Sequence, residues 1–293
     1  MKNKQQGLSL VELMIAMTLA VVLTAAVVNI FISSKSTYSV LNGQATMQEN
    51  GRFAVDFIRQ ELQKAGYRTY SYQMDGNKQR IYDQNNQLLV RAPDSGNVAP
   101  RDTFPAAGSF GAGKVVVGGA NTAANAMPNS DYLAVRYQRA DDGTMYDCLG
   151  AVIPRRADNQ IRIVTTRFFV SPESELMCQV SFDNDAPQAP VALVSGVDNL
   201  KVRFGVGKNG NVTAYTATPS TADEIYAVEF ALLASSDLQT TNNPVTTPFK
   251  LLDADVTAPD DKKIRQVFSQ TVKLRNVPSF AINSYQLASG VGP

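Results

Sequence analysis

The chain has 293 residues, of which 44% are hydrophobic, and its formal net charge is +1. This near-neutral balance argues against a nucleic-acid partner held by phosphate contacts. The absence of histidine excludes His-based catalytic triads and leaves almost no room for the usual Cys/His zinc sites. The sequence also lacks the G-x-S-x-G and H-E-x-x-H motifs. We therefore expect one or two domains, no metal or cofactor, and no enzymatic activity.

The first 32 residues form the most distinctive stretch of the chain. Two lysines precede Gly7, and an apolar run follows from Leu8 to Ile32, in which Glu12 is the only charged residue. About 20 apolar residues are enough for a helix to cross the ~30 Å core of a bilayer. We therefore predict a membrane-spanning helix. The preceding lysines favour a cytoplasmic N-terminus, so that the rest of the chain would be exported.

Glu12 needs a partner in this apolar run. A carboxylate in the apolar part of a membrane helix costs on the order of 3 kcal/mol, and less near the interface. A cut between Gly7 and Leu8 would supply the partner, because the new α-amine of Leu8 is a cation four residues before Glu12. That spacing puts both groups on one face of a helix, and the amine of a neighbouring chain is the alternative partner. The cut would remove both leading lysines and leave 25 basic residues against 26 acidic ones.

The segment GLSLVEL at residues 7–13 resembles the class III leader junction of type IV pilins and pseudopilins. The resemblance implies that a prepilin peptidase cuts after Gly7 and methylates Leu8, and that Glu12 acts in assembly. Leu8 is a departure, since phenylalanine is commonest there. One alternative is a plain signal anchor with a stray glutamate. Another is an ordinary secretory signal, whose cleavage site would follow the apolar region instead of preceding it.

Residues 33–66 are amphipathic and predict a continuation of the same helix. Apolar residues at helical spacing make one stripe: Met47, Ala54, Ile58, Leu62 and Ala65. Charged residues supply the polar side: Glu49, Arg52, Asp56, Arg59, Glu61 and Lys64. Gly66 is a natural stop, whereas Gly43 and Gly51 are weak helix formers at which bends or frays are expected. One helix of about 58 residues would be ~87 Å long. No single soluble domain can bury it, so its first half must lie in lipid or against similar helices.

The remaining chain carries β-strand signals separated by polar loops. Alternating or β-branched segments predict strands at 114–118, 132–137, 149–153, 160–170, 175–181, 197–206, 212–216, 225–234 and 267–276. Asn209-Gly210 signals a hairpin turn. The segment 225–234 is the most apolar and is predicted to be central, and 239–263 is predicted to be a polar loop. We expect an α+β fold, with a long N-terminal α-helix packed on an antiparallel β-sheet domain.

The chain has two cysteines, Cys148 and Cys178. In an oxidising compartment they would form one disulfide. Its loop of about 30 residues would contribute roughly 3–4 kcal/mol on the chain-entropy model. The alternative is a pair of unbonded, buried thiols.

Two further segments resemble W-type minor pilins (PilW). One is the helix 49–67, which ends in Ala-Gly-Tyr; the other is 196–205, followed by two strands that end near Leu-Arg-Asn276. The resemblance implies a leader at 1–7, a transmembrane and assembly segment at 8–32, an amphipathic half-helix at 33–66, and an exported pilin domain at 67–293.

The function implied is that of a minor pilin. Such a chain helps to prime assembly of type IV pili and enters the filament, at its tip in our expectation. The implied partners are other minor pilins and the major pilin through the N-terminal helix, the prepilin peptidase, and a tip adhesin as a further candidate. The chain would lie in the inner membrane with a periplasmic C-terminal domain, and later in the pilus on the cell surface. The alternatives are a minor pseudopilin of type II secretion, and a membrane-anchored adhesin with residues 92–130 as its contact loop.

Overall fold

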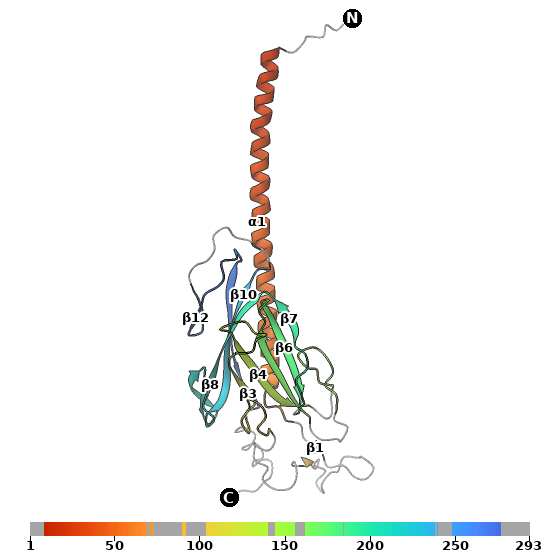
Figure 1. Cartoon of the computed structure of the whole chain (residues 1–293), viewed down its shortest axis with the longest axis vertical. Helices are drawn as coiled ribbons and strands as arrows, with labels where there is room; N and C mark the ends of the chain where they lie inside the picture. Colours follow the sequence, from red (N-terminus) through yellow and green to blue (C-terminus); the bar gives the residue numbers. More distant parts are fainter. Residues whose placement is uncertain are drawn as a thin grey trace.

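The computed structural model describes residues 9–68, 71–72, 90–91, 104–139, 144–155, 162–183, 185–237, 239 and 248–276. One helix, α1 (Leu10–Lys64), has 55 residues and follows the long axis of the molecule (Figure 1). At 1.5 Å per residue it is ~80 Å long. Its first half projects from the β-rich part of the chain, and its second half runs into it (Figure 1). The expected α+β architecture is confirmed.

The strands pair in antiparallel fashion. They are β1 (Ser71–Tyr72), β2 (Val90–Arg91), β3 (Val116–Ala120), β4 (Asp131–Gln138), β5 (Ile163–Val170), β6 (Glu175–Phe182), β7 (Val191–Ser195), β8 (Val197–Lys208), β9 (Asn211–Thr216), β10 (Glu224–Ser235), β11 (Phe249–Leu251), β12 (Ala254–Val256) and β13 (Arg265–Lys273). The two larger sheets have the orders β3-β4-β5-β6-β7 and β13-β10-β8-β9, and two small ladders join β1 to β2 and β11 to β12.

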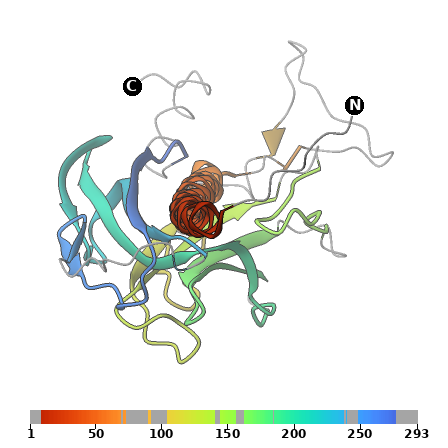
Figure 2. The same ribbon diagram turned by 90° about the horizontal axis from the view of Figure 1, so that it is seen from above.

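The second half of α1 lies between the two larger sheets, as the view along the helix shows (Figure 2). It contacts β10 and β13 of one sheet and β4 and β7 of the other. The predicted apolar stripe is confirmed: Ala54, Ile58 and Leu62 are fully buried in a core shared with both sheets. The amphipathic half of the helix is therefore the central element around which the domain folds.

The helix runs without interruption through both glycines at which bends or frays were expected. Gly51 has a different role. A Cβ added there would overlap the ring of Phe268 on β13. Gly51 thus allows the helix and the strand to approach closely, at a cost in helix propensity of roughly 1 kcal/mol.

Several strand predictions are confirmed. The hairpin between β8 and β9 turns at Asn209 and Gly210, whose φ angles are +52° and +81°. This backbone suits the Asn-Gly pair. Strand β10 lies between β13 and β8 and is fully buried over most of its length, as its apolar sequence predicts.

Two predictions from local pattern are wrong. Residues 149–153 form no strand; a single bridge joins Tyr146 to Val152, and the Asp147 carboxylate accepts hydrogen bonds from the backbone of Leu149 and Ala151. The segment 239–263 contains the short hairpin of β11 and β12, which packs its Leu251 against β10. Residues 149–153 are held by a side chain, and the β11–β12 hairpin is held by a strand distant in sequence. The alternation of apolar and polar residues records neither contact.

The disulfide between Cys148 and Cys178 is confirmed. It ties the loop before β5 to strand β6, with the two Cα atoms 6.6 Å apart. Both cysteines are buried. The bond therefore holds an irregular loop against the five-stranded sheet.

Candidate functional site

The first half of α1 is an exposed apolar rod. Every residue from Leu10 to Tyr38 is exposed, and the most apolar 18-residue window has a mean hydropathy of 2.5. By length and composition, α1 is the one helix in the described part of the chain that could cross a membrane. An apolar surface of this length requires lipid or other apolar helices around it.

The two threonine hydroxyls in the most apolar part of this rod bond to the helix backbone itself. Thr18 Oγ1 donates to the carbonyl oxygen of Met14 at 2.6 Å, and Thr24 Oγ1 donates to that of Ala20 at 2.7 Å. Such bonds let a hydroxyl lie in an apolar medium without a further partner. Glu12 is then the single charged group from Leu10 to Ser34.

Glu12 lies in the first turn of α1. The residue before the helix, Ser9, has an extended backbone and makes no capping bond with its side chain. The backbone N–H of Leu13 donates to the carbonyl of Ser9, so the three N–H groups before it lack an acceptor inside the helix. A negative side chain is favourable at this end of the helix dipole. Ser9 and Glu12 also have capping-box spacing, a local signal that the sequence analysis missed.

The predicted cleavage residues Gly7 and Leu8 lie outside the described residues. Their roles remain predictions from the sequence.

The other end of α1 is clamped by both sheets. Gly66 has φ +71°, and its N–H donates to the carbonyl of Arg136 on β4 at 2.9 Å. From the other sheet, Asn276 Nδ2 donates to the carbonyls of Gln63 and Ala65 at 3.4 and 3.3 Å. These last carbonyls of a helix have no partner inside it. We call Gly66 and Asn276, with these bonds, the helix-end clamp; it fixes the rod to the domain.

Glu61 was placed on the polar side of the helix, and that prediction is wrong. Its exposed fraction is 3%. It forms an ion pair with Lys64, and Thr166 Oγ1 on β5 donates to it at 3.2 Å. Lys64 also donates to the carbonyl of Tyr146 at 2.9 Å. Burial raises the pKa of Glu61, and the Lys64 charge opposes that shift. Glu61 is next to Leu62 of the buried stripe, and Thr166 of β5 covers this side of the helix. The helix sequence alone does not show that a strand packs there.

Arg136 is a second buried charge near the clamp that sequence analysis missed. Its guanidinium donates to the carbonyls of Pro105 and Lys114 at 2.8 and 2.6 Å. It lies over the rings of Phe104 and Phe110, 5.7 and 4.2 Å from their centres. Burial lowers the pKa of Arg136 to about 10. The residue attaches the loop before β3 to the strand that receives the N–H of Gly66.

Two protein-family models match the sequence. The prokaryotic N-terminal methylation motif matches residues 2–28, and the type IV pilus-assembly protein W model (PilW) matches residues 163–276. These matches support a PilW-type type IV pilin. No curated protein sequence is significantly similar to this chain. The solved structure of a type IV-like pilin from Thermus thermophilus resembles it at 13% sequence identity and a TM-score of 0.45, over 78% of this chain and 96% of that one.

One match covers the start of α1, and the other covers Asn276, which bonds to the end of α1. The methylation motif spans the leader junction and much of the exposed rod, and this match supports prepilin peptidase processing, membrane anchoring and later entry into a pilus. The PilW match begins at β5 and ends at Asn276, the residue that caps the end of α1. The PilW domain therefore includes the half of the helix-end clamp that is distant from the helix in sequence.

Proposed function

We propose that this protein is a minor pilin that helps to prime assembly of type IV pili and is incorporated at the pilus tip. The observation that carries the proposal is helix α1, whose exposed first half has one carboxylate, Glu12, at its free end and whose second half is fixed in the domain by the helix-end clamp. A rod of this kind is suited to pack among similar helices. The β-rich domain extends beyond it with long connections, which fits an end position better than a crowded shaft.

The mechanism that we propose starts with the cut after Gly7. It creates the cationic α-amine of Leu8, and Glu12 pairs with this amine or with that of a neighbouring subunit. An unpaired carboxylate in the apolar layer costs on the order of 3 kcal/mol, so pairing favours the assembled state. Before assembly the helix lies in the inner membrane, and the lysines ahead of it favour a periplasmic position for the domain. The partners are other minor pilins and the major pilin.

Replacing Glu12 by valine tests the pairing role. The Glu12→Val chain should be processed normally but should give few pili by electron microscopy, because the carboxylate that stabilises docking is gone. Glu49→Val is the matched control, since Glu49 is an exposed carboxylate farther along the same helix. Normal piliation in Glu12→Val would refute the pairing role.

Processing is tested separately. N-terminal sequencing of the mature protein should begin at methylated Leu8, and Gly7→Asp should leave a slower-migrating band. Intact full-length chain in functional pili would contradict this part of the proposal.

A deletion strain tests whether the protein acts in pilus assembly or in secretion, and immunogold labelling tests where it lies in the pilus. Deletion should reduce surface pili; loss of secreted enzymes with normal pili would instead identify a type II secretion pseudopilin. Immunogold label should lie at pilus ends, and even labelling along the shafts would overturn the tip position.

A further inference from the structure

Among the described residues, strand β13 is the most regular unpaired edge of the two larger sheets. It has nine residues, contains neither glycine nor proline, and pairs with β10 without a register shift. The other edge strands are shorter: β3 and β7 have five residues each and β9 has six. The β7 and β9 ladders also contain register shifts. Proteins protect edges by shortness, bulges, proline or charged side chains, and β13 has only the last of these.

Alternate residues of β13 direct their backbone N–H and C=O groups away from β10. The N–H of Leu274 donates to the carbonyl of Tyr226, so Leu274 directs its backbone toward β10. In an antiparallel ladder residues alternate between facing the partner and facing away. Val272 and Gln270 therefore also face β10, whereas the N–H and C=O groups of Lys273 and Thr271 face outward. Within the described part of the chain, no hydrogen bond uses these outward groups.

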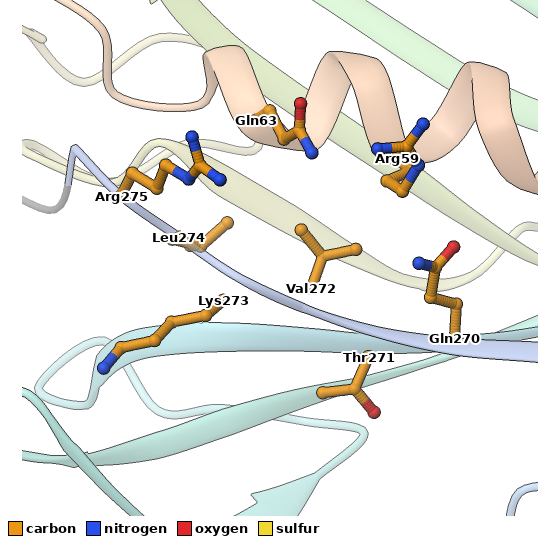
Figure 3. Close-up of a pocket in the computed structure, with 8 residues that line it drawn as sticks. All are labelled: Arg59, Gln63, Gln270, Thr271, Val272, Lys273, Leu274 and Arg275. Carbon is orange, nitrogen blue, oxygen red and sulfur yellow. The ribbon is translucent and has the colours of Figure 1, made fainter.

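A groove of about 530 Å³ runs between this strand and α1 (Figure 3). Arg59 and Gln63 of the helix form one wall, and Gln270 and Val272 point from the strand toward them (Figure 3). The six strand-side residues, 270–275, span ~20 Å in extended form. This length is enough for about five residues of a second strand.

The groove is basic. Its lining contains Arg59, Lys273 and Arg275 and no acidic residue. Arg59 pairs with Asp56, but Lys273 and Arg275 form no ion pair with any described residue. Lysine on an edge discourages indiscriminate strand pairing. The same charges favour an incoming strand that carries carboxylates.

We propose that the open edge of β13 accepts an extended, acidic segment of a neighbouring pilin as an added β-strand. The proposal rests on the proposed function, because the neighbour is a subunit of the same assembly. The outward groups of Thr271 and Lys273 bond the added backbone, and Arg275 and Lys273 pair with its carboxylates. The groove beside α1 leaves room for its side chains. Docking here places the contact beside the second half of α1, the half that is packed in the domain.

Residue-resolved hydrogen exchange tests the proposal with the full-length pilin. The chain is purified alone in detergent and in the minor-pilin complex recovered from its own membranes through a C-terminal tag. The amides of Thr271 and Lys273 should exchange at least about ten-fold more slowly in the complex. The amides of Gln270 and Val272, which bond to β10, are the internal reference and should be protected in both samples. Equal exchange at Thr271 and Lys273 in an intact complex would overturn strand addition and leave the proposed function standing.

Two variants of Thr271 give a second test of strand addition that does not depend on hydrogen exchange. Thr271→Pro removes an outward N–H without touching the ladder to β10, whereas Thr271→Val keeps it. The proline variant should recover less than about a tenth of the partner pilins that the valine variant recovers, with the same urea midpoint. Equal recovery by both variants would refute the edge contact. Failure of any pilin to co-purify even with the unaltered chain would instead contradict the proposed function.

Discussion

Replacing Gly66 by alanine should release the end of α1 from the domain. Gly66 has φ +71°, a conformation that costs a residue with a Cβ roughly 1–2 kcal/mol. The added Cβ would also overlap the carbonyl oxygen of Asn276. The strand end must then move, and the hydrogen bonds from Asn276 to Gln63 and Ala65 are lost, at about 1 kcal/mol each. We expect a total destabilisation of about 3–4 kcal/mol.

Urea unfolding of the detergent-solubilised chain measures this loss. The chain has 11 tyrosines and no tryptophan, so tyrosine fluorescence is the signal. Gly108→Ala is the matched control, because Gly108 has φ +55° but no atom within 4 Å of an added Cβ. The control should lose only the backbone part, roughly 1–2 kcal/mol. If both variants lose the same free energy, the overlap with Asn276 has no consequence and the clamp is refuted.

Three further predictions concern buried groups of the domain. Because burial raises the pKa of Glu61, the folded chain binds a proton there more tightly than the unfolded chain, so this residue lowers stability as pH rises above the usual carboxyl range. Urea midpoints from about pH 4 to about pH 8 should show this decline, and Glu61→Gln should reduce it; an unchanged slope would contradict it. Replacing Cys148 and Cys178 together by alanine should cost roughly 3–4 kcal/mol in the same assay, and an unchanged midpoint would exclude a stabilising disulfide. Arg136→Lys should speed proteolysis of residues 104–114, because lysine lacks the planar fork whose two nitrogens bond separate carbonyls; equal cleavage rates would argue against this role.

The correct predictions from sequence share a local cause. The apolar stripe, the helix stop at Gly66 and the Asn209-Gly210 turn each depend on residues within one or two turns of each other. The apolar rod is also local, because its length and composition alone make it incompatible with water. The resemblance to PilW pilins in 196–276 was confirmed by the family match at 163–276.

The errors come from contacts between distant segments. Glu61 has the polarity of a surface residue, and only the position of Thr166 on β5 makes it a buried hydrogen-bond acceptor. The strand predicted at 149–153 has the right residue types, but the Asp147 side chain and the disulfide at Cys148 hold this segment in a loop. The β11–β12 hairpin forms where polarity predicted none, because Leu251 can pack against β10.

The sequence by itself determined which end of the chain carries the processing signal and the apolar surface. Both features are encoded in a short stretch of consecutive residues. The tertiary structure alone decided how the rod is attached and which edge of the domain is open. Asn276 caps a carbonyl 211 residues away in the chain, and β13 is an edge only because the fold places β10 on one side and a groove on the other. These contacts join segments that are distant in sequence and form only when the whole core is packed, so no local sequence pattern encodes them.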